Sequence, residues 1–202
     1  MGNKPNRKSQ HQRRKSVATK QAMPTPWGKR VGAAAAVLVV VAVVGVIALS
    51  PEPASGVPVG TESVDVAAPS HAEGELHEDG EVPAGGEHNP VWLNCGFYDS
   101  EVDSEFAVHS LEHGAVWITY NPSIGAEGID RLRTLVQRDR KVIVSPVASL
   151  EDPVLATAWA NQLRLDSADD ERIEQFINEF SGSFNAPEPA GSCRGGVGNP
   201  TF

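Results

Sequence analysis

The stretch HSLEHG, residues 109–114, holds the densest group of reactive side chains in this chain. If it is helical, His109 and His113 are i and i+4, and Glu112 lies on the same side, with Cβ atoms about 5–6 Å apart. Two imidazoles at that spacing can bind one metal ion. In a strand the histidines would be about 13 Å apart, at ~3.3 Å per residue. A metal site here therefore requires a helix.

The flanking residues favour that helix. Asp103 or Ser104 can cap its start, and Gly114 can end it in the left-handed conformation. The pattern H-x-x-E-H is also that of inverted zincins, in which two histidines hold zinc and the glutamate is the general base. No clear third-ligand motif follows, however, so the peptidase hypothesis lacks its expected context. A third interpretation is a polar helix end whose imidazoles make only structural hydrogen bonds.

The N-terminal fifty residues predict where this chemistry takes place. Residues 1–30 carry nine Lys or Arg and no acidic residue, and residues 31–49 form an uncharged apolar run of 19 residues. As a helix this run is about 28 Å long, against a bilayer hydrocarbon core of ~30 Å. Because positive flanks stay in the cytoplasm, 1–30 is predicted to be a cytoplasmic tail and 31–49 a single transmembrane helix. The rest of the chain would then be extracytoplasmic.

A cleaved signal peptide is the alternative interpretation of residues 31–49. Its apolar region would usually be only ~7–15 residues long and would end in a site resembling A-x-A. The sequence ALSPE that follows here is a poor match. An uncleaved signal anchor in the cell membrane is therefore favoured, with the lipid bilayer as partner of residues 31–49.

The charge of the remaining chain restricts its partners. Only eight of the 17 Lys and Arg, but all 26 Asp and Glu, lie after residue 30, which gives a formal charge of −18. This argues against nucleic acid, whose binding depends on basic patches. It suits metal ions, a cationic envelope protein as partner, or simple solubility.

Composition also divides the outer part. Residues 50–90 are rich in Pro, Gly, Ala, Ser and Glu with few large apolar residues, so they predict a flexible acidic tether. Large apolar residues return from residue 91, and 91–202 is predicted to be one globular domain.

Periodicity predicts an α+β fold for this domain. Residues 115–122 and 141–147 are typical of strands, and Ile129 to Val136 has helical spacing. Residues 153–166 favour a long strand, although 155–163 is also compatible with a helix. A second helix follows Ser167. The order βαββα predicts a ferredoxin-like, mainly antiparallel sheet with helices on one face.

The two cysteines, Cys95 and Cys193, lie near the two ends of this domain. An even count in an oxidising compartment favours pairing. The chain-entropy model predicts that a bridge closing such a loop stabilises the folded state by about 4.7 kcal/mol. Metal binding by the two thiolates is the alternative, but neither cysteine lies in a C-x-x-C or C-x-H pattern.

A longer set of motifs resembles a known family. The run from GEHNPVW through CGFY and HSLEHG to YNP, followed by VSPV, AWANQLRLDSADDERIEQFI and PEPAGSCRGGVG, is similar to domain-of-unknown-function family 3105 (DUF3105). The similarity covers about residues 71–198. It implies a single-pass, membrane-anchored exported domain of bacteria, without an established activity. His88 belongs to the matching block, and His71 lies in an upstream segment that is also similar.

These histidines widen the candidate metal site. Together with HSLEHG they supply ligands suited to Zn(II) or Cu(II); the predicted set is His71, His88, His109, Glu112 and His113. Three functions stay open: metal binding, which we favour, a metal-free interaction or scaffold module, and a metal-dependent hydrolase with Glu112 as base.

Overall fold

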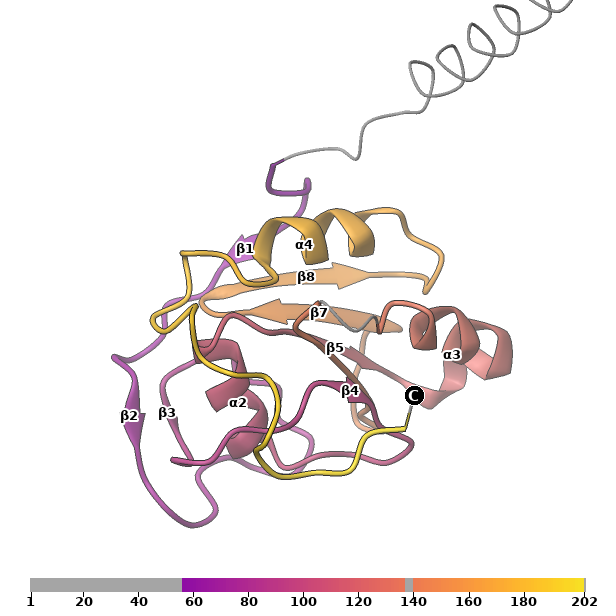
Figure 1. Cartoon of the computed structure of the whole chain (residues 1–202). Coiled ribbons are helices and arrows are strands. Elements are labelled where there is room, and N and C mark those ends of the chain that lie inside the picture. The colour runs from indigo at the N-terminus through magenta and orange to yellow at the C-terminus, as the bar shows by residue number, and fades with distance from the viewer. Residues whose placement is uncertain (1–55, 137–139, 202) are drawn as a thin grey trace, which may run out of the picture. The chain divides into compact units, whose positions relative to one another are not determined.

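The computed structural model describes residues 56–136 and 140–201 (Figure 1). Within these residues no helix is long and apolar enough to span a bilayer. The predicted cytoplasmic tail, 1–30, and the predicted transmembrane helix, 31–49, lie outside the described residues.

The described residues form a mixed α+β domain built mainly of sheet. Six strands pair in the order β1-β8-β7-β5-β6-β4. These strands are β1 (Glu62–Ser63), β4 (Gly96–Phe97), β5 (Val116–Tyr120), β6 (Val142–Pro146), β7 (Val154–Ala158) and β8 (Asn161–Leu165). The pairs β1–β8, β7–β8 and β5–β7 are antiparallel, whereas β5–β6 and β4–β6 are parallel. Two further short strands, β2 (Ser70–His71) and β3 (Glu87–His88), form a separate parallel pair.

Local patterns predicted the central elements well. The β-branched and aromatic runs became β5 and β6. The helix predicted from the spacing of Ile129 to Val136 is α3 (Gly125–Arg133), which starts earlier, directly after the short 3-10 turn η1 (Pro122–Ile124), and ends before Leu135. The second helix, predicted after Ser167, is α4 (Arg172–Phe180). Residues 153–166, predicted as one long strand, form a hairpin instead.

That hairpin, β7–β8, turns at two residues. Ala158 pairs with Asn161, so Trp159 and Ala160 make the turn, and Ala160 takes a positive φ of 57°. Neither turn residue is a glycine, proline, asparagine or aspartate, so the sequence carried no turn signal at this point.

The helices cover both faces of the sheet, which corrects the prediction of helices on one face. Leu132 of α3 and Phe176 of α4 pack on the face that holds Val116 and Ile118 of β5. The first helix of the domain, α2 (Ser104–Glu112), packs through Leu111 on the other face, where Trp117 lies. Successive strand residues point to opposite faces, so β5 contributes to both clusters. Figure 1 shows α2 on the other side of β5 from α4.

The sheet also differs from a ferredoxin-like split unit. In the split arrangement another strand lies between the two parallel strands that a helix connects. Here β5 and β6, connected through α3, are direct neighbours in register from Val116↔Val142 to Tyr120↔Pro146. The sequence pattern predicts element order, but it does not predict which strands pair.

The segment predicted as a flexible tether packs on the domain over its described part, residues 56–90. β1 pairs with β8, and Ala84 and His88 are buried. The backbone of this segment is also held by side chains, as in the bond from Gln162 Nε2 to the Val82 carbonyl, 2.9 Å. Low hydrophobicity did not prevent order here, because the segment adds strands to a core formed by other residues.

The predicted disulfide is present. Cys95 and Cys193 are bonded, with Cα atoms 5.4 Å apart and a sequence separation of 98. The Cys95 N–H also donates to the Cys193 carbonyl, 2.9 Å, and Leu93 forms a parallel bridge with Val197. The C-terminal segment is therefore fixed beside residues 92–98 and close to the end of α2.

Candidate metal centre

The HSLEHG stretch is helical up to its last two residues. Helix α2 ends at Glu112, His113 is its C-cap, and Gly114 has a φ of 80°. The Gly114 N–H donates to the Leu111 carbonyl, 2.9 Å, and the Ala115 N–H donates to the Ser110 carbonyl, 2.8 Å. These two bonds are those of a Schellman motif, in which glycine is the favoured residue at the left-handed position. The helix on which the metal hypothesis depended is confirmed.

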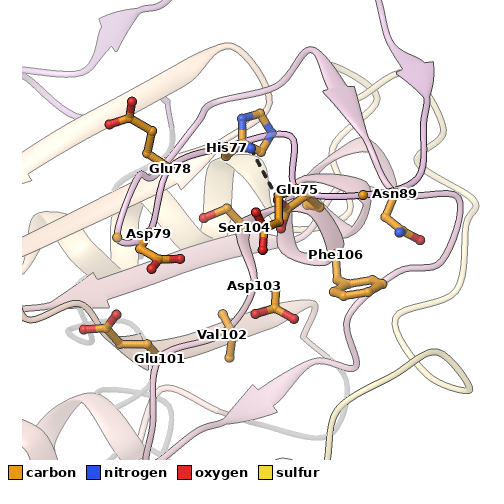
Figure 2. Close-up of a pocket in the computed structure, with 13 residues that line it drawn as sticks. Glu75, His77, Glu78, Asp79, Asn89, Glu101, Val102, Asp103, Ser104 and Phe106 are labelled. Carbon is orange, nitrogen blue, oxygen red and sulfur yellow. Dashed lines mark hydrogen bonds between the residues drawn. The ribbon is translucent and has the colours of Figure 1, made fainter.

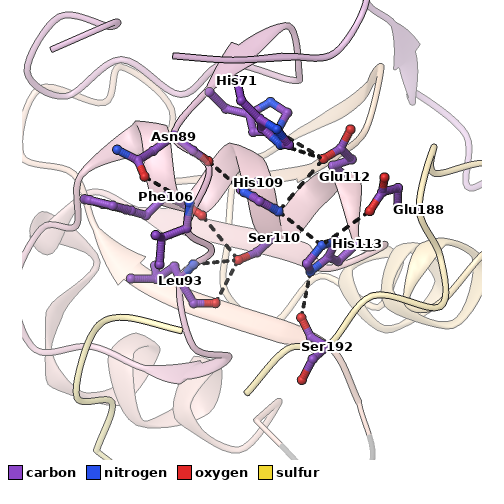
Figure 3. A network of polar contacts seen from close by, with 12 residues as sticks. His71, Asn89, Leu93, Phe106, His109, Ser110, Glu112, His113, Glu188 and Ser192 are labelled. Carbon is purple, nitrogen blue, oxygen red and sulfur yellow. Dashed lines mark hydrogen bonds and ion pairs between the residues drawn. The ribbon is translucent and has the colours of Figure 1, made fainter. Parts of the chain in front are cut away.

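His109 and His113 face each other at the end of this helix. Their Nε2 atoms are 3.1 Å apart, and both residues are buried, at 4% and 5% exposure (Figure 3). Two ligand nitrogens bound to one ion at about 2.0–2.1 Å, in tetrahedral geometry, lie about 3.3 Å from each other. The two imidazoles are therefore already close to the separation that a shared ion requires.

Backbone carbonyls fix which nitrogen of each buried ring carries the hydrogen. His88 Nδ1 lies 2.9 Å from the Gly86 carbonyl, His109 Nδ1 2.7 Å from that of Asn89, and His113 Nδ1 2.7 Å from that of Ser192. A carbonyl only accepts, so each Nδ1 must donate its hydrogen. In the neutral ring this leaves a lone pair on every Nε2. Such fixed tautomers are typical of metal-binding histidines, whose second nitrogen is held by an outer partner.

Glu112 is the carboxylate on which three imidazole rings converge. Its Oε2 lies 3.0 Å from His88 Nε2, 3.7 Å from His71 Nε2 and 4.0 Å from His109 Nε2. One ligand atom from each of these four residues lies within 4.8 Å of the others. His88 is fully buried, whereas the His71 side chain is 49% exposed. The centre is thus buried on the α2 side and open to solvent at His71.

The predicted ligand set and the most compact group of candidate ligands differ at one residue. His71, His88, His109 and Glu112 form the compact group, and His113 lies beside it with its Nε2 3.1 Å from that of His109. His113 Nε2 instead lies 3.8 Å from Oε2 of Glu188, which the sequence analysis did not single out. Glu188 has no metal-binding spacing in the sequence. It reaches the centre because its N–H donates to the Glu112 carbonyl, 2.9 Å, at the end of α2.

The C-terminal segment and Lys141 hold His113 in place. Lys141 Nζ donates to the carbonyls of His113, Pro189 and Gly191 at 2.7–2.8 Å, which joins the helix end to the C-terminal segment. Burial lowers the pKa of this lysine. Gly191 packs directly on the His113 ring, because a Cβ there would lie 2.2 Å from ring atom Cδ2. Glycine is needed at 191 for this close approach.

The surroundings of His109 favour its neutral, metal-binding form. Burial lowers the pKa of His109, and the nearby His113 and His88 lower it further, against the opposing effects of the bond to Asn89 and of Glu112. Trp92 covers both α2 histidines, with ring centroids 5.8 Å from His109 and 5.3 Å from His113. Because metal binding requires unprotonated imidazole, this environment keeps His109 available at neutral pH.

An acidic hollow lies next to the centre. It has a volume of about 460 Å³ and is lined by Glu75, Glu78, Asp79, Glu101 and Asp103 among others (Figure 2). Asn89 belongs to both places, since its carbonyl orients His109. His77 lines the hollow as well, and its ring contacts the Glu87 carbonyl rather than the other imidazoles. The negative charge of this surface raises the local concentration of cations near the centre.

The fold and the cluster together define a mixed α+β domain with a buried histidine and glutamate centre at the end of one helix. The chain belongs to the family described as "Protein of unknown function (DUF3105)", whose model matches residues 71–195. The match spans all the residues of the centre, Glu188 included, and both cysteines. No curated protein and no solved structure matches the chain.

Proposed function

We propose that this chain is a membrane-anchored, extracytoplasmic domain that binds a transition-metal ion, Zn(II) or Cu(II), through His71, His88, His109 and Glu112. The main support for this proposal is that imidazole nitrogen lone pairs and a carboxylate point toward one another in a buried place. The Nδ1 atoms of His88 and His109 donate to carbonyls, so their Nε2 atoms face the Glu112 carboxylate without a hydrogen of their own in the neutral state. Buried acceptors that face each other are costly unless a cation or a proton lies between them.

The donor set fits these metals. Imidazole nitrogen with one carboxylate oxygen suits Zn(II) and Cu(II), whereas Ca(II) and Mg(II) take mostly oxygen ligands. His71 is the exposed member and gives the ion a route from solvent. Glu112 contacts His88 directly, which supports a role as ligand or as an orienting group more than a role as a free general base. Binding is therefore better supported than hydrolysis.

The location is proposed from other features. The basic residues 1–30 and the apolar residues 31–49 support a signal anchor with the domain outside the membrane. The Cys95–Cys193 bond supports an oxidising compartment. Addition of a membrane-impermeant protease to intact cells tests this: the domain should be degraded from outside, and protection of the domain would contradict the topology.

Metal binding is tested on the full-length chain in detergent, after chelation and dialysis. We expect Zn(II) and Cu(II) to bind with at least one ion per chain in calorimetry and elemental analysis. His109→Ala should weaken this binding by about 100-fold or more, because His109 contacts both Glu112 and His113. His77→Ala is the matched control, a histidine of the same domain outside the centre, and should leave binding unchanged.

Two results decide the test. Near-UV circular dichroism must show that His109→Ala keeps the tertiary packing, so that loss of binding is not loss of fold. If the unaltered chain binds no more tightly than the folded His109→Ala variant, the metal function is wrong, and a metal-free interaction module for a cationic envelope partner becomes the better proposal.

A further inference from the structure

The centre contains two places where unprotonated acceptor atoms face each other, rather than one. His88 Nε2 lies 3.0 Å from Glu112 Oε2, and His109 Nε2 lies 3.1 Å from His113 Nε2. In each place the Nδ1 hydrogens are already donated to backbone carbonyls. Each place therefore requires its own proton or metal ion to offset the repulsion between lone pairs.

The side chains around these two places form two sets of the same composition. His71 and His88 lie around Glu112, with His71 Nε2 at 3.7 Å from Oε2. His109 and His113 form the second set with Glu188, whose Oε2 lies 3.8 Å from His113 Nε2 (Figure 3). Each set has two imidazoles and one carboxylate, a combination that holds a divalent metal and leaves coordination positions open.

Building on the proposed metal function, we propose that the centre holds two metal ions when fully loaded, the first by His71, His88 and Glu112 and the second by His109, His113 and Glu188. One imidazole lone pair binds one ion, so His109 belongs to the second ion once both are present. At low metal it can serve the first ion, because its Nε2 is 4.0 Å from Glu112 Oε2. Glu112 lies where a carboxylate can contact both ions, as in binuclear sites with metals about 3.5–4 Å apart.

The second position differs from the first in how it is held. Glu188 is 63% exposed in its side chain, so it can move the short distance from 3.8 Å to a bonding contact. His113 is fixed by Ser192 and by the close packing of Gly191, both in the segment that the disulfide attaches to the domain. The second ion would thus join the end of α2 to the C-terminal segment.

The test is a titration of the metal-free full-length chain in detergent, with Zn(II) in calorimetry and Cu(II) in electron paramagnetic resonance. We expect two ions per chain, and at two equivalents of Cu(II) a half-field signal from two coupled ions. Glu188→Gln should weaken the second binding event by about tenfold or more and leave the first unchanged. Glu151→Gln, an exposed glutamate elsewhere on the domain, should change neither event.

His88→Ala should remove the first event and keep the second. If only one ion binds and Glu188→Gln has no effect, the second position is wrong while the proposed metal function stands. If two ions bind but the second is insensitive to both Glu188→Gln and His113→Ala, the second ion lies elsewhere and this assignment is also wrong. If no ion binds to the unaltered chain, the metal function itself fails.

Discussion

The two faces of the six-stranded sheet are covered in different ways. Under α3 and α4 the face is apolar, with Ile118, Leu132 and Phe176 among its fully buried side chains. Under α2 the apolar cluster is smaller, and His88, His109 and Glu112 are buried beside it. On this second face the disulfide and the Lys141 contacts supply constraints that a large apolar core supplies on the first.

The difference indicates that the two faces have different roles, one in stabilising the fold and the other in positioning polar side chains. Apolar burial is non-directional, so the α3–α4 face can stabilise the fold without fixing any polar group. Buried imidazoles and carboxylates must each be satisfied, so the α2 face is positioned by carbonyls, by Gly191 and by the C-terminal segment. We expect substitutions on the first face to change stability and substitutions on the second to change metal binding.

The largest effect is expected for Phe176→Ala on the apolar face. Phe176 is fully buried and packs against Phe180 in a tilted arrangement, with ring centroids 4.5 Å apart. Its truncation should lower the free energy of unfolding by about 3–5 kcal/mol, from lost burial and the cavity left behind. Denaturant unfolding of the metal-free chain measures this loss, and Zn(II) affinity should stay within about twofold. A parallel loss of affinity would show that the two faces are not independent.

A smaller effect on stability, but a specific one on metal binding, is expected for Gly191→Ala. The added Cβ would lie 2.2 Å from His113 Cδ2, so the ring must move away from the Ser192 carbonyl. Overpacking of this kind costs about 1–3 kcal/mol. Because His113 is assigned to the second ion, the second metal-binding event should weaken by about 10–100-fold. Denaturant unfolding should show the loss of stability, and calorimetry should show the loss of metal affinity.

A double-mutant cycle identifies the cause of that effect. In a His113→Ala background the clash is absent, so Gly191→Ala should cost little further stability. Equal costs in both backgrounds would mean that Gly191 acts through the backbone and not through the His113 ring.

The smallest effect is expected for Glu105→Gln at the opposite end of α2. Its Oε1 accepts from the N–H groups of Leu76, 2.8 Å, and His77, 3.3 Å, which attaches the segment between β2 and β3 to the helix. Burial alone would raise the pKa of Glu105, but these backbone bonds outweigh it, so the pKa is lowered. The carboxylate therefore stabilises the fold above its unfolded pKa of about 4.3, and this contribution is lost as pH falls through the lower folded pKa.

The expected cost of Glu105→Gln is about 1–2 kcal/mol at pH 7, since bonds to a charged group exceed those to a neutral amide. The difference from the unaltered chain should shrink as the pH is lowered towards 3 in denaturant unfolding. A difference that stays constant with pH would show that the charge of Glu105 is not what matters.

Part of the centre was predictable because its residues are close together in the sequence. The spacing of His109 and His113 and the position of Gly114 gave the helix, its end and the shared side of the two rings. His71 and His88 were suggested by family resemblance, and nothing in their spacing indicates that they meet Glu112. Glu188 had no local signal, since its contact with His113 joins positions 75 residues apart.

The sequence by itself determined the elements that depend on neighbouring residues: strands at β5 and β6, the helices, and the disulfide partners, because only two cysteines exist. Only the tertiary structure decided that α2 lies on the face opposite α4, that β5 and β6 are neighbours, and that residues 56–90 pack on the domain. Periodicity shows which side of an element is apolar, but the face against which it packs depends on contacts between residues distant in sequence.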